Sequence, residues 1–234
     1  GGKRKTRKST NKKKNKKTRS KKQKGGISSD EKLIEAVKDG NLDVIKEALE
    51  EGADVNAKDN TGDTALIKAI MISHDMEMKN SVELLLGQPE INVNASNNEG
   101  VTALMASAHG YTEIVRMLLG QPKINVNAMD IDGIRALMIA SENGHTEIVR
   151  MLLEKGANVN AADNDGNTAL IIAIENGHAE IVRMLLEKKA DVNAINYDYY
   201  YDHGTALIMA SELGYTEIVR MLLEKGADVN ATND

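Results

Sequence analysis

The residues that could carry out chemistry are few and scattered along this 234-residue chain. The chain has no cysteine, which excludes a disulfide framework and a thiolate metal site. Residues 163–166, DNDG, supply the oxygen ligands that Ca²⁺ prefers, but a calcium loop would place its first ligand at Ala161, which has none. His109 and His203 have no matching ligand nearby. The sequence predicts no catalytic, cofactor or metal site, and therefore a protein that is not an enzyme.

The charges are divided between two unlike parts of the chain. Residues 1–26 hold 14 of the 30 Lys and Arg residues and no Asp or Glu, so residues 27–234 hold 16 basic against 35 acidic residues, a balance of −19. The first segment has no aliphatic or aromatic side chain, and it is predicted to be a disordered tail. Gly25-Gly26 marks the boundary.

The tail is suited to binding polyanions without sequence preference, because flexible cations contact phosphates electrostatically. The candidate residues are Lys3, Arg4, Lys5, Arg7, Lys8, Lys12, Lys13 and Lys14. A nuclear import signal, a nucleic-acid tether, contact with an anionic membrane and a solubilising role all remain open. Base stacking is not supported, since the tail lacks aromatic residues. The tail could also lie against the acidic part of the chain at low salt.

The rest of the chain repeats itself, which decides the fold class. The triplet Val-Asn-Ala begins at residues 55, 93, 126, 159, 192 and 229, with spacings of 38, 33, 33, 33 and 37. Between triplets the order is constant: a turn of the form D/N-x-x-G, the residues T-A-L, a short apolar helix, Gly, and a second apolar helix. One such unit cannot cover its own apolar face, so successive units must stack into an all-α solenoid.

Residues 163–195 show how each part of a unit is expected to fold. Asp163 and Gly166 fit a type I turn at the tip of a hairpin-like finger, and Thr168 can cap a helix that begins at the next residue. Gly177 ends that helix in the left-handed conformation. The positions expected to face inward are Leu170, Ala173 and Ile174 in the first helix, and Ile181, Val182, Leu185 and Leu186 in the second.

The 33-residue period, with G-H-x-E-I-V and G-A-D-V-N, resembles the ankyrin repeat over residues 30–234. The T-P-L-H start of that family appears here as TALI, TALM or RALM, and the style of the array is similar to those of large DNA viruses. The predicted domains are the tail, 1–26, and an ankyrin domain, 27–234. Its units cover about 27–58, 59–96, 97–129, 130–162, 163–195 and 196–231. In the family's G-H position, occupied by His145 and His178, the ring braces neighbouring backbone.

The two ends of the array differ. The first unit lacks the finger and is rich in Glu and Lys, so it is predicted to be an N-terminal cap, with Ser28 and Glu31 forming a capping box. The sixth unit ends with an ordinary apolar helix and no polar cap. We expect the natural array to continue beyond Asp234.

Four added residues lengthen the finger of the sixth unit and carry most of the aromatic side chains. Tyrosine offers large, stiff contact area and is favoured at interfaces, so the loop is interpreted as a binding finger. The alternative is that the rings fold back onto neighbouring fingers. The candidate residues are Tyr197, Tyr199, Tyr200, Tyr201, His203 and the adjacent Ile195.

A second candidate contact patch lies on the finger of the fourth unit, where Met129, Ile131 and Ile134 accompany Arg135. Arg135 replaces the helix-capping Thr, a loss worth about 1 kcal/mol. Drift in a single repeat explains the same residues equally well. Another insertion, of four residues around 71–80, is expected between the two helices of the second unit, on the edge opposite the fingers.

The resemblance implies a scaffold or adaptor that binds a protein partner of unknown identity through its concave face and fingers. The competing interpretation is a nucleic-acid or chromatin-associated protein tethered by the basic tail. With no membrane span and no signal-peptide core in the sequence, we expect an intracellular protein, cytoplasmic or nuclear, and a monomer.

Overall fold

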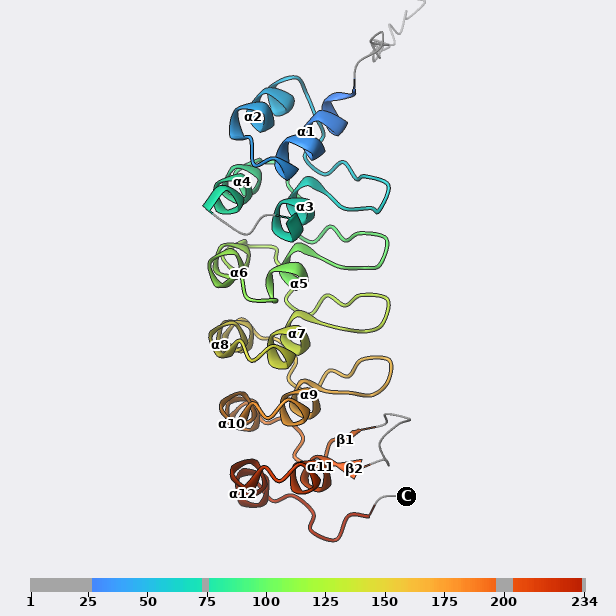
Figure 1. Ribbon diagram of the computed structural model, residues 1–234, viewed down its shortest axis with the longest axis vertical. Helices are drawn as coiled ribbons and strands as arrows, with labels where there is room; N and C mark the ends of the chain where they lie inside the picture. Colours follow the sequence, from blue (N-terminus) through green and yellow to red (C-terminus); the bar gives the residue numbers. More distant parts are fainter. Residues whose placement is uncertain (1–26, 73–75, 197–203, 233–234) are drawn as a thin grey trace, which may run out of the picture.

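The computed structural model describes residues 27–72, 76–196 and 204–232, and these form a single column of stacked helix pairs (Figure 1). Each inner helix contacts the inner helix of the next unit, and each outer helix contacts the next outer helix. The inner helices are α1 (Ser29–Lys38), α3 (Ala65–Ile72), α5 (Ala103–Ser107), α7 (Ala136–Glu142), α9 (Ala169–Glu175) and α11 (Ala206–Glu212). The outer helices are α2 (Leu42–Glu50), α4 (Met76–Leu86), α6 (Thr112–Leu119), α8 (Thr146–Glu154), α10 (Ala179–Glu187) and α12 (Thr216–Glu224). The predicted all-α repeat solenoid is confirmed.

The fingers project from the inner helices on the side away from the outer helices (Figure 1). In the four fingers that are described in full, the first residue folds the loop around its own side chain. Asp163 Oδ1 accepts hydrogen bonds from the N–H groups of Asp165 at 3.0 Å and Asn167 at 2.8 Å, and Gly166 N–H donates to the Asp163 carbonyl oxygen at 3.2 Å, as expected for the predicted turn. Asp59, Asn97 and Asp130 accept the same pair of bonds in their own fingers.

A threonine at the base of most fingers caps the helix that follows. The hydroxyl oxygen of Thr168 accepts a hydrogen bond from the N–H of Ile171, so the predicted cap is confirmed. Arg135 precedes α7 without a side-chain cap. In the sixth unit the finger's two sides pair as antiparallel strands, β1 (Ile195–Asn196) and β2 (Gly204–Thr205).

The core is one continuous aliphatic layer between the inner and outer helices. All seven inward-facing positions predicted for residues 163–195 are buried. Alanines on the inner helices, such as Ala140 and Ala173, are fully buried and allow the helices to approach closely. Ser81 is 1% exposed, and its hydroxyl has no hydrogen-bond partner among the described residues. It occupies the position of Ile114 in the next unit, so the second unit carries a local packing defect.

Glycine and an aromatic or imidazole ring meet where one unit stacks on the next. A Cβ on Gly144, whose φ is 74°, would lie 2.8 Å from Cε1 of His178. The ring of His178 in turn lies with Nε2 2.9 Å from the carbonyl oxygen of Glu142. Gly177 faces the ring of Tyr215 in the same way. The predicted bracing of backbone by His178 is therefore confirmed, and the ring position has a structural purpose.

The asparagines of the first five Val-Asn-Ala triplets connect each unit to the next, a role that the sequence analysis missed. The side-chain oxygen of Asn127 accepts a hydrogen bond from the N–H of Asn158 at 2.8 Å, and its amide donates to the Gly156 carbonyl at 3.3 Å. The same two-way contact recurs for Asn56, Asn94 and Asn160. We call these contacts the asparagine staples.

Two irregularities differ from the sequence prediction. The extra residues of the second unit were expected between the helices, but several of them lengthen α4, which begins at Met76 and spans 11 residues. In the third unit α5 has five residues where α7 has seven. The sequence explains this, since Thr102 lies eight positions before Gly110 whereas Thr168 lies nine before Gly177. An extra residue later in the unit restores the 33-residue spacing and conceals the deletion.

The two ends of the array are finished differently. At the start of α1, Ser28 and Glu31 form the predicted capping box, with hydrogen bonds in both directions. At the other end the last described unit exposes apolar groups, including Leu223 on α12 and Val229, which is 67% exposed. The equivalent Val55 is 5% exposed because the next unit covers it.

The staples should carry a measurable share of the stability. We expect Asn127→Ala to lower the free energy of unfolding by about 1–2 kcal/mol, because it leaves the N–H of Asn158 without its partner. Asn143→Ala is the matched control, since the amide of Asn143 donates only to the Ile139 carbonyl within its own unit. Equilibrium urea unfolding measures both. Equal losses in the two variants would refute a special role for the staple.

Candidate functional site

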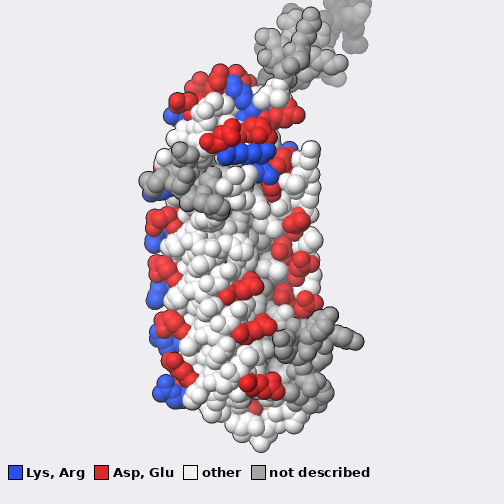
Figure 2. Space-filling view, viewed as in Figure 1, with Lys and Arg blue, Asp and Glu red and all other residues white. Residues whose placement is uncertain are grey.

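The face formed by the fingers and inner helices is acidic in the middle and C-terminal parts of the array. In Figure 2, Asp and Glu side chains lie along the fingers and over α7, α9 and α11, while Lys and Arg gather at the N-terminal end and along the outer-helix edge. The exposed acidic side chains of this face include Glu99, Asp132, Asp165, Glu142, Glu175 and Glu212. Along the outer helices the charges alternate in sign, as in the Arg183–Glu180 pair. That pairing holds the pKa of the Glu180 carboxyl below its usual value, through the hydrogen bonds from Arg183.

The predicted apolar patch on the 130–134 finger is exposed. Met129 is 58% and Ile131 64% exposed, whereas Ile134 is half-buried beneath them. The backbone holds the tip in place, because the N–H of Ile131 donates to the Glu99 carbonyl of the preceding finger at 2.9 Å. Ile131 therefore presents its side chain from a fixed position. Whether the patch binds a protein stays a prediction.

Arg135 has a structural role that the sequence analysis missed. Its Nη1 donates to the carbonyl oxygens of Gly133 at 2.7 Å and Ala162 at 2.8 Å, and its Nη2 lies 3.3 Å from the Sδ of Met129. The guanidinium thus joins its own finger to the next one. Much of its hydrogen-bonding capacity is used within the molecule, so the contact patch rests on its apolar members.

The tyrosine loop lies outside the described residues, as do Tyr197, Tyr199, Tyr200, Tyr201 and His203. Its flanks are described: Ile195 pairs with Thr205 and Asn196 with Gly204. Ile195 is 39% exposed. The basic residues assigned to polyanion binding, Lys3 to Lys14, also lie outside the described residues. Both assignments stay predictions.

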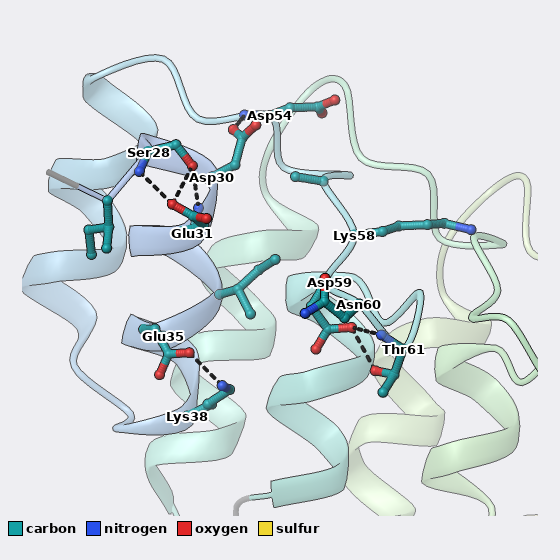
Figure 3. Close-up of a pocket in the computed structure, with 13 residues that line it drawn as sticks. Ser28, Asp30, Glu31, Glu35, Lys38, Asp54, Lys58, Asp59, Asn60 and Thr61 are labelled. Atoms are coloured by element: carbon teal, nitrogen blue, oxygen red, sulfur yellow. Dashed lines mark hydrogen bonds and ion pairs between the residues drawn. The ribbon is translucent and has the colours of Figure 1, made fainter. Parts of the chain in front are cut away.

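A groove of about 730 Å³ separates α1 from the first finger (Figure 3). Acidic groups surround it, but most of them already have partners. Glu31 belongs to the capping box and Glu35 pairs with Lys38, while Asp30 accepts a hydrogen bond from the N–H of Asp54 at 2.8 Å. Lys58 points out of the groove toward the next finger, where its Nζ donates to the Ser96 carbonyl. Most polar side chains that line the groove thus already form hydrogen bonds or ion pairs within the protein.

A smaller pocket of about 190 Å³ lies between the fourth and fifth units. Its apolar wall consists of Ile134, Met138, Ile139 and Ile172. Its polar lining consists of Glu142, Asp163, Asn167, Glu175 and Asn176. Side chains from α7, α9 and the 163–167 finger thus meet here, and we call this space the α7–α9 pocket. It combines an apolar wall with acidic side chains, of which Glu142 and Glu175 are exposed.

Other kinds of site find less support in the described part of the chain. No group of three or more His, Asp or Glu side chains within it could hold a metal ion. Among these same residues, no helix is long and apolar enough to cross a membrane.

Models of ankyrin repeats match residues 33–130, 123–196 and 202–234, which together cover most of the array. The chain belongs to the ankyrin repeat family. Among solved structures it is similar to an ankyrin repeat domain from Acinetobacter baumannii AYE, at 31% identity and a TM-score of 0.73, over 84% of this chain and 98% of that one. It is also similar to the ankyrin repeat domain of Bcl-3, a member of the IkappaB protein family, at 30% identity and a TM-score of 0.72, over 86% and 89% of the two chains.

The second unit holds a mostly buried lysine beside its finger. The Nζ of Lys68, on α3, lies 2.7 Å from Oδ2 of both Asp59 and Asp63, at the base of the first finger. Burial would raise the pKa of each carboxyl, but hydrogen bonds from Lys68 and Thr61 outweigh it, and both pKa values fall below the usual range. Asp63 also accepts a hydrogen bond from the Asn97 amide at 2.9 Å. Lys68 thereby links the inner helix to the first finger, and Asp63 extends the cluster to the next finger through Asn97. The sequence analysis missed this cluster.

This cluster should make stability depend on pH. We expect Lys68→Met to lower the free energy of unfolding by about 2 kcal/mol at pH 7, because the buried Asp63 and the half-buried Asp59 lose their counter-ion. Since the folded-state pKa values of Asp59 and Asp63 lie below the unfolded value of about 3.9, their contribution is complete above that pH and is lost as the pH falls through the folded values. The difference in free energy of unfolding between wild type and variant should therefore become smaller below about pH 4.

Urea unfolding at a series of pH values measures this difference. Lys46→Met serves as the control, because Lys46 forms only an exposed pair with Asp43 at 3.9 Å. A difference between wild type and Lys68→Met that stays constant down to pH 2 would contradict the ionic account.

Proposed function

We propose that this ankyrin repeat protein is a non-catalytic scaffold or adaptor that binds a protein partner through its fingers and concave face. Ankyrin repeat domains are in general modules of protein–protein interaction. The observation that carries the proposal is the exposed apolar pair, Met129 and Ile131, at the 130–134 finger. Contiguous exposed apolar side chains on a rigid surface mark interaction sites.

The comparison between fingers supports this function. Asn98 and Asn164 occupy the position of Ile131 in the neighbouring fingers, and their amides donate to the finger before them. The side chain of Ile131 cannot form the hydrogen bond that Asn98 and Asn164 make, and it exposes an apolar surface to water. Both changes cost stability, so binding provides a reason for them. The acidic groups beside the patch, Glu99 and Asp132, favour a partner surface that is apolar at its centre and basic around it.

The double variant Met129→Ser/Ile131→Asn tests the proposal with residues that this chain itself uses at the same positions, Ser96 and Asn98. Proteins captured by wild type should be captured about tenfold less by the variant, since central apolar contacts dominate interfaces. The midpoint of urea unfolding should remain unchanged or rise. Quantitative mass spectrometry of captured proteins, followed by calorimetry with the purified partner, measures the loss.

The tyrosine loop provides a second arm of this experiment. Replacing Tyr199, Tyr200 and Tyr201 by Ser should reduce capture of the same partner without changing the unfolding midpoint. A large loss of stability would instead support rings packed on neighbouring fingers. If both variants capture the partner as wild type does, the proposal that the fingers bind the partner is refuted.

The composition of the tail favours a second candidate function, nonspecific polyanion binding. Its 14 basic residues contrast with an array whose fingers are acidic and would repel phosphates. Duplex DNA should bind the full chain with an affinity that falls steeply with salt. A variant with Gln at Lys3, Arg4, Lys5, Arg7 and Lys8 should show a smaller slope, by about 0.9 for each phosphate that the tail no longer neutralises. Fluorescence anisotropy between about 50 and about 300 mM NaCl, where counterion release dominates, measures the slope. An unchanged slope would remove the tail from this role.

A further inference from the structure

We propose that the α7–α9 pocket receives a lysine side chain of the partner protein. This inference rests on the proposed binding function and names the chemistry that one part of the face recognises. The pocket's volume of about 190 Å³ suits one long side chain rather than a folded element. Its lining offers two kinds of surface, and a lysine has a matching part for each.

The apolar wall fits the lysine stem. Ile172 and Ile134 are half-buried at the pocket, and Met138 and Ile139 are buried behind them. Methylene groups packed on such a surface lose contact with water while the charged end stays at the rim. The lining also includes the exposed Glu142 and the half-buried Asp163, whose carboxylates would meet the ammonium group.

The protein already contains a lysine in the equivalent position of another unit. Ile172 is the fourth residue of α9, as Lys68 is the fourth of α3. Asp163 and Asn167 likewise correspond to Asp59 and Asp63, the two residues that bind the Lys68 ammonium. The second unit thus fills the place with its own lysine. The fifth unit has the equivalent carboxylate, Asp163, and the equivalent helix, α9. Ile172 stands there in place of the lysine and brings no ammonium group into the pocket.

Electrostatics favours an external cation at this place. Glu142 is the last residue of α7 and Glu175 the last of α9, where the negative ends of the helix dipoles lie. Acidic side chains are unfavourable there, and no hydrogen bond or ion pair engages the Glu142 carboxylate within the described residues. A lysine ammonium would relieve this repulsion. Asp163 accepts hydrogen bonds from its own finger, so Glu142 is the carboxylate that would bind the ammonium group most directly.

The test uses the full chain with ¹³C-labelled isoleucine methyl groups and the probe acetyl-Leu-Lys-Leu-amide. NMR titration should shift the methyl signals of Ile134, Ile139 and Ile172 in a saturable way. The uncharged analogue with norleucine in place of lysine should bind about fivefold more weakly, as expected for a half-exposed ion pair. An arginine analogue shows whether the site prefers an ammonium.

Two variants keep the test independent of folding defects. Asp163→Asn combined with Glu142→Gln should weaken the lysine probe about fivefold but not the norleucine probe. The turn should survive, because Asn97 makes it in another finger. Ile172→Lys, which copies Lys68, should place an internal ammonium in the pocket and abolish binding of the probe.

The outcomes separate this inference from the proposed function. Absence of saturable shifts, or equal binding of the lysine and norleucine probes, overturns the lysine site. If Met129→Ser/Ile131→Asn still loses partner capture, the scaffold proposal stands without it. If the Ile172 signal of the full chain moves with salt before any probe is added, and does not do so when the tail lysines are replaced by Gln, the pocket belongs to the chain's own tail. That result overturns the assignment to a partner.

Discussion

The structure depends on contacts between successive units, because no unit can form its own core. Burial of aliphatic side chains drives the stacking, but it is not directional and leaves the offset between units undefined. The asparagine staples provide direction, since Asn127 must meet the backbone of Asn158 and Gly156 at fixed points. The rings of His178 and Tyr215, set under glycines that have no room for a Cβ, define the same offset on the outer side. The fingers inherit their spacing from these contacts, and a binding surface made of fingers is only as regular as the stacking beneath it.

Much of the fold could be predicted because the same residue types recur at the same positions of each repeat. Thr168, Gly166 and Gly177 each have a local reason for their position, so the turn, the cap and the helix end follow from short-range chemistry. The staples could not be predicted in this way, since the Val-Asn-Ala triplet served only as a marker and the partner of Asn127 lies 31 residues away. The shortened α5 was missed because a compensating residue kept the period at 33. The four extra residues around 71–80 were expected between the two helices, although helix propagation carries part of this segment into α4.

The candidate site was predictable to a lesser degree, for a related reason. Exposure of Met129 and Ile131 follows from their place on a finger, which the repeat pattern already gives. The roles of Arg135 and Lys68 required knowledge of which groups surround them: one guanidinium spans two fingers, and one ammonium lies between two carboxylates. The α7–α9 pocket could not be predicted, because it forms between Ile172 and Asp163 of one unit and the α7 residues of the unit before it. Single-residue differences between otherwise equal units thus distinguish the surfaces of the individual fingers.

The uneven finish of the two ends has a further consequence. The first unit is closed by a capping box and by Lys32, which pairs with Glu47 and Glu51, whereas in the last one Leu223 and Val229 face water. In a linear stack, the end with the smallest buried area opens first. Amide hydrogens of α11 and α12 would therefore exchange with solvent ahead of those in the central helices. The short strands β1 and β2 would share this local opening, because β2 contacts α11 and pairs with β1.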